Sequence, residues 1–535
     1  MRVVFHNGNV YTGELPLVSA FIVEDGRFAD VGSDEAILKA AEPGDNLINL
    51  NGDFVCAGFN DSHMHLLNFG LTLSYAPLYR NTESLKAVMD CMKEHLRLHP
   101  VSEGQWLCGR GWNQDFFKDT TRMPSRWDLD EVSRDVPIMI TRTCGHCCVV
   151  NSKLLELAGI TSETESPSGG RIGVENGEID GRLYDNAMDI LDVCRPIPTK
   201  EDIKRMILLA ASELNRYGVT SAQTDDYCVF RDVPADVVNS AYRELEKAEM
   251  LTVRVCEQCN FTELEALEAF IASGETEKGS DFFKTGPLKL LGDGALGSRT
   301  AHLSKPYKGT DSYGFSLFSP EHMKRMVACA NAHGMDAAIH AIGDACLDEV
   351  LDAVECALRE NPRPEHRHGV VHCQVSRADQ LERMISLGVH IYAQSIFLDY
   401  DNHIIEKLVP DDLAKTSYCW KTLLKNGLNV SNGSDCPVEL PDVMKGIECA
   451  VTRTSMDGTG PYLPDEAFTV REAIDSFTSS SAIASHDEDI KGTIKKGMLA
   501  DFVILGANPF DADARAIHRI PVKATFVGGR EVFRA

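Results

Sequence analysis

Two histidines separated by one residue end an apolar segment near the start of the chain. His63 and His65 follow residues 54–60, a run with the character of a β-strand. Side chains at positions i and i+2 of a strand point to the same face, so the two imidazoles can converge on one point. Neutral imidazole is a good ligand for zinc and similar divalent metals, and Asp61 is near enough to accept a hydrogen bond from one of the rings. A bare His-x-His pair is also common at the surface end of a strand, so its meaning depends on the rest of the chain.

Further candidate ligands stand at the ends of other predicted strands. His340 and His372 each end a short apolar run, and another run leads into Asp435. Lys289 lies inside an apolar run, where a lone ammonium group would be costly to bury. Addition of CO₂ would convert that lysine into a carbamate, which is an anionic oxygen ligand. Together with the first two histidines, these residues predict a metal site of the binuclear type that holds one or two Zn²⁺ or similar divalent ions per chain.

The elements that carry these residues alternate between strands and helices. Most of the apolar runs are preceded by a segment with helical periodicity, which predicts an α/β fold built on a parallel (β/α)₈ barrel, or TIM barrel. Active-site residues of such barrels lie at the carboxyl ends of the strands, and the candidate ligands occupy those positions. The predicted strands are residues 54–60, 219–223, 252–256, 288–291, 336–340, 369–372, 389–393 and 428–432.

The remaining segments predict additions to the barrel. Far more residues separate the first and second strands than a crossover needs, so residues 68–210 are expected to be an insertion within the barrel domain. Both ends of the chain are rich in short strands and in Asn-Gly or Asp-Gly hairpin signals. We therefore predict a composite β-sandwich domain made of residues 1–56 and 490–535, with the metal-dependent barrel over residues 57–489.

The amino-acid composition excludes some classes of binding partner. The 535 residues include 53 bases and 80 acids, for a net charge of -27, which argues against nucleic acid or an anionic membrane surface as a partner. The 17 cysteines follow no disulfide framework and look like reduced thiols. No signal peptide and no long apolar segment is visible in the sequence. These features predict a soluble cytoplasmic protein. The net charge says little about the substrate, and the expected partner is a small-molecule substrate.

Several motifs give the chain a resemblance to a known family. Over essentially its whole length it resembles the amidohydrolase superfamily, and it is most similar to the amidohydrolase-3 branch, which includes N-substituted formamide deformylase-like and YtcJ-like proteins. In the sixth strand Val371 stands where the family often has glutamate. The matching segments are AGFNDSHMH at 57–65, LKLLGDGALGSRTA at 288–301, GSDCPV at 433–438 and GTIKKGMLADFV at 492–503, together with residues 144–146 and 151–152 of the insertion.

The resemblance assigns roles to the candidate ligands. It implies that the two histidines of the first strand bind a buried metal with Asp435. Carboxylated Lys289 would then bridge to a second metal held by His340 and His372. Whether the site holds one metal or two is left open, because Lys289 can also remain unmodified, and Asp293 is then an alternative acid near the site.

The resemblance also implies a mechanism and substrate contacts. Asp435 is expected to accept a proton from the attacking water and to deliver it to the leaving amine. His146 and Arg299 are candidates for contacts to the substrate, although each can equally have a structural role. A homodimer is the assembly that the family suggests.

Three functions compete on this evidence. The first is hydrolysis of a carbon–nitrogen bond in an amide, an N-substituted formamide or a cyclic amide, rather than in a peptide. The second is deamination or ester hydrolysis on the same scaffold; related deaminases usually place a glutamate three residues after the histidine of the fifth strand, where this chain has Gly343. The third is a binding protein without catalytic activity, but such relatives typically lose ligands that are all present here.

Overall fold

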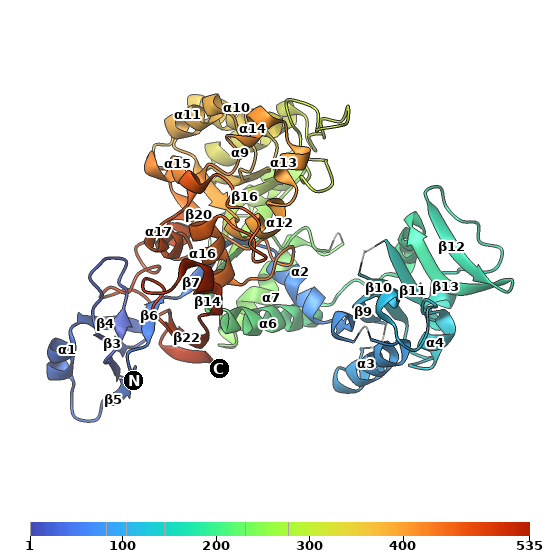
Figure 1. The fold of residues 1–535 in the computed structure, drawn as a ribbon, viewed down its shortest axis with the longest axis horizontal. Coiled ribbons are helices and arrows are strands. Elements are labelled where there is room, and N and C mark those ends of the chain that lie inside the picture. Colours follow the sequence, from blue (N-terminus) through green and yellow to red (C-terminus); the bar gives the residue numbers. More distant parts are fainter. Residues whose placement is uncertain (1, 82, 103, 144–145, 231, 277) are drawn as a thin grey trace. The chain divides into compact units, whose positions relative to one another are not determined.

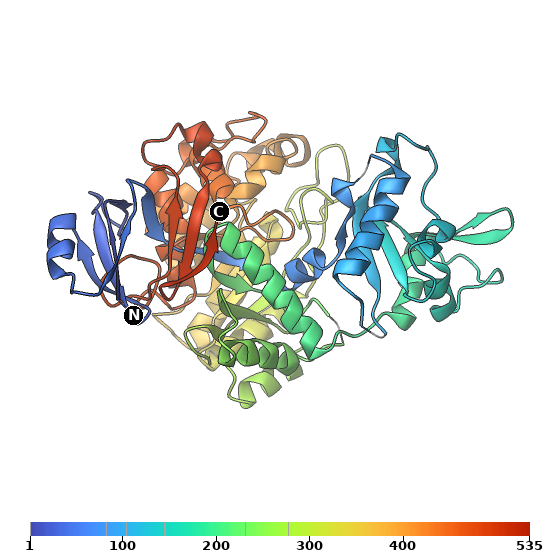
Figure 2. The same ribbon diagram turned by 90° about the horizontal axis from the view of Figure 1, so that it is seen from below.

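The computed structural model describes residues 2–81, 83–102, 104–143, 146–230, 232–276 and 278–535. These residues form two compact units. The first contains the described residues of 2–68 and 210–535, and the second those of 69–209. Figures 1 and 2 show the chain in two views.

Eight parallel strands form a nearly closed sheet in the first unit, which confirms the predicted barrel. In chain order they are β7 (Phe59–Met64), β14 (Val219–Thr224), β15 (Arg254–Asn260), β16 (Phe283–Leu291), β17 (Ala337–Ala341), β18 (Gly369–His372), β19 (His390–Ala393) and β20 (Val430–Asn432). The helices that separate successive strands from β14 to β20 include α7 (Ala235–Lys247), α8 (Leu264–Ala272), α9 (Pro320–Ala332), α10 (Asp344–Glu360), α11 (Ala378–Leu387) and α15 (Trp420–Lys425).

The first and last strands of the barrel are joined just beyond the end of β20. The backbone N–H of Asp435 donates to the carbonyl oxygen of His63 at 2.9 Å. The hydroxyl of Ser434 donates to Asp61, whose buried carboxylate also accepts from the Ser434 backbone. A Cβ atom at Gly433 would lie 2.6 Å from the backbone nitrogen of His63, so only glycine allows this approach. The junction therefore brings together His63 of the first strand and Asp435, which follows the last strand.

The first predicted strand is in fact two strands. Residues 54–60 were expected to form one barrel strand, but β6 (Phe54–Ala57) pairs with β21 (Phe502–Leu505) outside the barrel, and β7 begins at Phe59. Gly58 separates them, and a Cβ atom there would lie 2.3 Å from the Thr220 side chain. A continuous apolar run does not reveal this division, because both halves are buried.

The two ends of the chain build a pair of small sheets. One contains β1 (Arg2–His6), β3 (Ala20–Glu24), β4 (Arg27–Gly32) and β5 (Asn46–Asn49). The other contains β2 (Asn9–Val10), β6, β21, β22 (Val522–Val527) and β23 (Arg530–Arg534). Phe5 and Phe21 of the first sheet pack with Phe502 and Phe526 of the second in one apolar cluster. The blue and red strands lie side by side in both views (Figures 1 and 2).

The second unit has a sheet of its own. Its six strands are ordered β12 (Gly170–Glu175), β13 (Glu178–Asp185), β11 (Cys147–Val150), β10 (Ile138–Arg142), β9 (Leu107–Trp112) and β8 (Ala76–Pro77). Helix α3 (Leu85–Leu98) lies against this sheet in Figure 2. Its buried residues Val88 and Met92 belong to the same apolar cluster as residues of the strands. Trp106 and Trp112 are buried in the two apolar clusters of this unit, so both contribute to its core.

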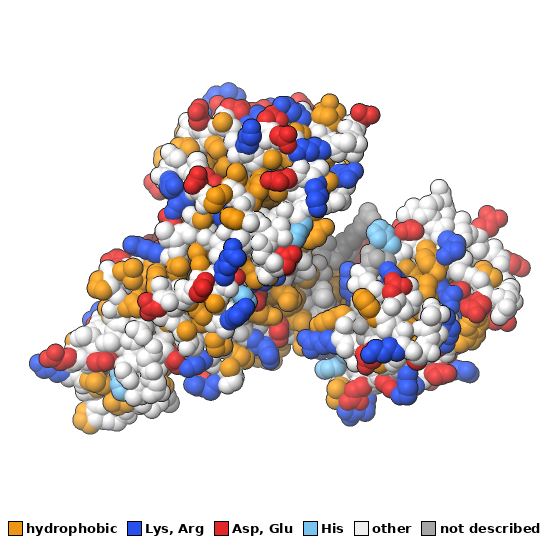
Figure 3. Space-filling view, viewed as in Figure 1, with side chains coloured by type: hydrophobic (Ala, Val, Ile, Leu, Met, Phe, Trp, Pro, Cys, Tyr) orange, Lys and Arg blue, Asp and Glu red, His pale blue; other side chains and the backbone are white. Residues whose placement is uncertain are grey.

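Two further observations concern the charges on the surface and the hydropathy of the helices. On the face drawn in Figure 3, lysine and arginine side chains are interspersed with aspartate and glutamate. Among the described residues, no helix combines the length and the apolar character that crossing a bilayer requires.

Candidate metal centre

Every strand of the barrel contributes a polar side chain at or just beyond its carboxyl end. They are His63 and His65 from β7, Asp225 from β14, Gln258 from β15, Lys289 from β16, His340 from β17, His372 from β18, Gln394 from β19 and Asp435 from β20. All except His65 are buried. Burial of these imidazole, carboxylate, amide and ammonium groups costs free energy unless they form hydrogen bonds or ion pairs with one another. Their pairing therefore determines which ions the site can bind.

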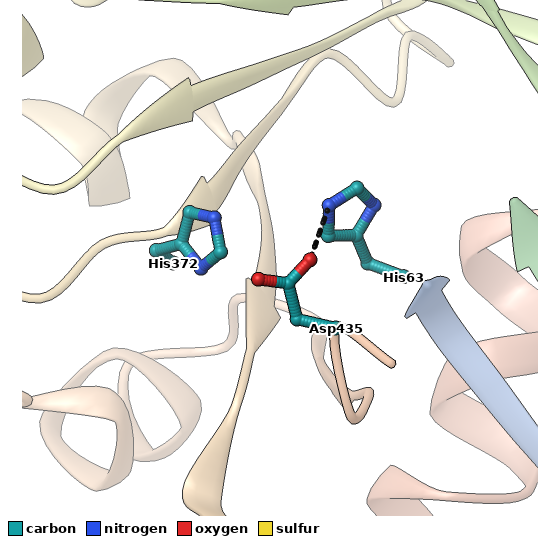
Figure 4. A group of neighbouring side chains, drawn as sticks. All are labelled: His63, His372 and Asp435. Atoms are coloured by element: carbon teal, nitrogen blue, oxygen red, sulfur yellow. Dashed lines mark ion pairs between the residues drawn. The ribbon is translucent and has the colours of Figure 1, made fainter. Parts of the chain in front are cut away.

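Three of these side chains form one tight group of candidate ligands. One nitrogen of His63, one nitrogen of His372 and one oxygen of Asp435 all lie within 4.8 Å of one another. Figure 4 shows the carboxylate of Asp435 between the two imidazoles. Its Oδ1 lies 3.4 Å from Nε2 of His63. Asp435 and His372 have left-handed backbones, with φ of 57° and 75°, a conformation that is uncommon outside glycine and is often found at functional sites.

Two glutamines fix how the histidines of this group are oriented. The amide of Gln258 donates from Nε2 to the carbonyl of Ser62, which leaves its Oε1 to accept from Nδ1 of His63 at 2.7 Å. Oε1 of Gln394 lies 2.8 Å from Nδ1 of His372, although Nε2 of this amide has no hydrogen-bond partner among the described residues. A histidine that donates from Nδ1 keeps a lone pair on Nε2, the form that binds metals.

This arrangement fits a divalent metal. With Nδ1 protonated, Nε2 of His63 presents its lone pair toward the carboxylate of Asp435, and two electron-rich atoms in this position require a cation between them. Burial lowers the pKa of His63 and of His372, so a proton is a poor choice for that cation. Burial opposes the ionisation of Asp435, but the histidines around it favour its charged form, so the pKa of that carboxyl lies well below its usual range.

His65 lies between this group and a second one. Its Nε2 is 3.1 Å from Oδ1 of Asp435, and its Nδ1 is 3.2 Å from the carbonyl oxygen of Asp225. A second set of neighbouring donor atoms comes from His65, Asp225 and Cys228. Oδ1 of Asp435 thus lies close to Nε2 of both His63 and His65, and the expected sharing of one metal by these three residues stays a prediction.

Lys289 has an anionic neighbour that the sequence analysis did not anticipate. Its Nζ lies 3.7 Å from Oδ2 of Asp225, and both side chains are buried. The same Oδ2 also accepts a hydrogen bond from Asn260. A buried ammonium group thus has a carboxylate within reach and does not need modification to be compensated.

His340 is placed beside a second carboxylate. Its Nδ1 lies 3.0 Å from Oδ1 of Asp293, although the angle is unfavourable for a hydrogen bond. Asp293 is fully engaged by backbone N–H groups of His302, Ile342 and Gly343. The ring of His340 lies 4.4 Å from that of His372, centroid to centroid. Asp293 therefore holds the loop after β17 and orients His340 electrostatically.

The two predicted substrate contacts lie in different surroundings. His146 belongs to the second unit, where its exposed ring lies 3.2 Å from Asp185; its neighbours Cys144 and Gly145 fall outside the described residues. Arg299 is exposed in the loop after β16 and has a left-handed backbone with φ of 59°. Neither residue belongs to the two groups of candidate ligands.

Three further residues of the ring at the strand ends were missed from the sequence, and so was Cys228 of the second group. Asp225 and Gln394 each directly follow a strand that the sequence predicted, so the rule that selected the histidines would also have found them. Gln258 was missed because the third strand was expected to end at residue 256, whereas β15 continues to Asn260. Amide side chains also carry no metal-ligand signal in a sequence.

Comparison with known proteins identifies what the chain is similar to. Residues 46–533 match the model of the amidohydrolase family. The putative amidohydrolase YtcJ of Bacillus subtilis is 33% identical over 100% of this chain and 99% of its own length. The N-substituted formamide deformylase of Arthrobacter pascens is 26% identical over 98% of this chain and 96% of its own. A crystal structure of an uncharacterized metal-dependent hydrolase from Pyrococcus furiosus superimposes with a TM-score of 0.79 at 28% identity, covering 96% of this chain and 100% of the other.

Proposed function

Because the chain belongs to the amidohydrolase family, we propose that it is a metal-dependent hydrolase that cleaves a carbon–nitrogen bond other than a peptide bond. The substrate class is an amide, an N-substituted formamide or a cyclic amide. The observation that carries the proposal is the group formed by His63, His372 and Asp435, whose donor atoms face one another at the carboxyl end of the barrel. The formamide deformylase among the relatives supports this choice of bond.

The proposed metal is Zn²⁺ or a similar divalent ion. His63, His372 and Asp435 would hold it through two nitrogens and one oxygen, a donor set that suits zinc. When bound, such an ion lowers the pKa of water and polarises a carbonyl group. Gln258 and Gln394 keep both imidazoles in the metal-binding form, because their Oε1 atoms accept from Nδ1.

The proton transfers are assigned to Asp435. Its carboxylate lies beside the proposed metal ligands, where it is placed to accept a proton from the attacking water. The same carboxyl group would return that proton to the nitrogen of the leaving amine, which otherwise departs as an unstable anion. His340 lies next to His372 in the ring of side chains and is placed to donate a hydrogen bond to the substrate carbonyl.

The charges around Lys289 indicate whether its side chain is an ammonium group or a carbamate. Paired with Asp225, the ammonium form is compensated without any further ion. A carbamate would instead place a second negative charge beside Asp225, which needs another cation nearby. We therefore propose that Lys289 is carboxylated only when a second divalent metal is bound, and that metal would use His340 as a ligand.

One experiment tests the proposed function. The purified protein would be stripped with a chelator, reloaded with Zn²⁺, and assayed on N-substituted formamides, acyl amides and cyclic amides, with amino-heterocycles and aryl esters as alternatives. We expect amine release that depends on the metal and falls at least about a hundredfold in Asp435→Asn. Asp475→Asn is the control, since it removes a partly buried carboxylate that accepts a hydrogen bond from Tyr11 and is not a candidate ligand. Ammonia release from the heterocycles would favour a deaminase, and no metal-dependent turnover on any substrate would contradict the proposal.

The surroundings of the protein are part of the same proposal. The free cysteines fit a reducing compartment, so we place the enzyme in the cytoplasm. The homodimer and the two substrate contacts at His146 and Arg299 stay predictions. A light-scattering mass in solution tests the first, and the KM values of alanine variants test the second.

A further inference from the structure

Beside the proposed zinc ligands lies a second group of donors that includes a thiol. We propose that His65, Asp225 and Cys228 form a separate position for a thiophilic divalent cation such as Zn²⁺, Co²⁺ or Cd²⁺. Their donor atoms, a ring nitrogen, a carboxylate oxygen and a sulfur, all lie within 4.8 Å of one another. This set differs from the expected second position, which used Lys289, His340 and His372 and contained no sulfur.

The geometry around Asp225 separates its two oxygens. Oδ2 faces Nζ of Lys289 at 3.7 Å and the amide of Asn260 at 3.4 Å. Oδ1 faces Sγ of Cys228 at 3.3 Å. The carboxylate can therefore keep its buried ion pair through one oxygen while it binds a metal through the other.

The spacing of the sulfur and the oxygen suits a shared metal ion. In a tetrahedral zinc site with ordinary Zn–S and Zn–O distances, two such ligand atoms lie about 3.6 Å apart. The observed 3.3 Å between Cys228 Sγ and Asp225 Oδ1 is close to this value. Cys228 is exposed, whereas Asp225 is buried, so an ion can enter from solvent on the side of the sulfur.

Binding exchanges protons for the cation. The thiol of Cys228 and the protonated ring of His65 release their protons to solvent, and the resulting thiolate and neutral imidazole bind the cation without any change of oxidation state. Thiolate and carboxylate then supply two negative charges against the divalent ion, and histidine adds a neutral nitrogen. A sulfur ligand selects zinc, cobalt or cadmium over magnesium or calcium. This inference deepens the proposed function, because the position shares the mouth of the same site.

Cobalt titration tests the position directly. The full-length apoprotein would be titrated with Co²⁺ in the absence of bicarbonate, while thiolate-to-cobalt charge transfer is followed in the near ultraviolet. We expect this band in the wild type and its loss in Cys228→Ser. Cys356→Ser is the matched control, since the Cys356 thiol also lies beside a carboxylate, that of Glu360, but is not part of the donor group. A band that is absent from the wild type, or that persists in Cys228→Ser, overturns the inference.

A second measurement uses the unaltered protein. Alkylation of Cys228 by iodoacetamide, followed by peptide mass analysis, should slow at least about tenfold when Cd²⁺ is added, because a metal-bound thiolate is a poor nucleophile. An unchanged rate at saturating Cd²⁺ would also overturn the position. The two proposals fail separately: a charge-transfer band without hydrolysis contradicts the enzyme function, and hydrolysis without the band contradicts the thiolate site.

Discussion

Oε1 of Gln258 lies 2.7 Å from Nδ1 of His63, and this contact determines which nitrogen of the histidine faces Asp435. The amide cannot easily reverse, because its Nε2 donates to the carbonyl of Ser62. A residue with no metal-binding atom of its own thereby sets the chemistry of a candidate ligand on another strand.

Removal of the Gln258 amide should mainly lower the affinity for zinc and have a smaller effect on the stability of the fold. In Gln258→Leu, Nδ1 of His63 loses its acceptor and the ring is free to adopt the other tautomer. We expect zinc affinity to fall about 10–100-fold, measured by competition with a chromophoric chelator.

The matched control for that variant is Gln223→Leu. Gln223 is a buried glutamine of the adjacent strand β14 that donates to Ser481 and does not contact a candidate ligand. Its loss should lower the free energy of unfolding and leave zinc affinity unchanged. Equal loss of affinity in both variants would mean that general loosening of the barrel, and not the tautomer of His63, is responsible.

A buried ion pair ties the barrel to the terminal sheets. Arg254 of β15 donates from Nε and Nη2 to both oxygens of Asp501, at 2.6 Å and 2.9 Å, and both side chains are at most 5% exposed. Arg254→Met leaves a buried carboxylate without its partner, so we expect the free energy of unfolding in urea to fall by about 3–5 kcal/mol. The double variant Arg254→Met, Asp501→Leu should recover much of that loss. If the double variant is as unstable as the single one, the cost lies in packing and not in the unpaired charge.

A buried histidine should make the protein sensitive to acid. Burial lowers the pKa of His368 from 6.5 to about 4, while its Nδ1 accepts from the backbone of Ala337 and its Nε2 contacts Asn331. Below pH 6.5 the unfolded chain binds a proton that the folded chain refuses, so stability falls as the pH is lowered toward 4 and is retained above 6.5. The loss approaches about 1.4 kcal/mol per pH unit for this group.

Urea unfolding at a series of pH values between 7 and about 4.5 checks this dependence. His368→Gln, which keeps one acceptor and one donor, should show a shallower decline than the wild type. His390, whose pKa burial lowers to about 3, contributes in the same direction and remains in both proteins. Identical slopes for the variant and the wild type would show that His368 is not the sensitive group.

Much of the barrel can be read from the sequence, because strands and helices are local patterns. Alternating apolar runs and helical segments predicted the parallel strands, and the rule that barrel sites lie at carboxyl ends selected His63, His340, His372 and Asp435. Residues at corresponding ends of neighbouring parallel strands necessarily meet at one rim, so their approximate position needs no knowledge of packing.

Pairing between distant segments is a property of the tertiary structure. Residues 54–60 are apolar throughout, and only the partners β21 and β14 divide them into a strand of the terminal sheet and a strand of the barrel. The orientation of His63 depends on Gln258, which lies 195 positions away in the chain. The ion pair of Lys289 with Asp225 likewise joins two strands. Local sequence fixes the type of each side chain, but hydrogen bonds and charge compensation depend on distances of a few ångströms that only the folded chain sets.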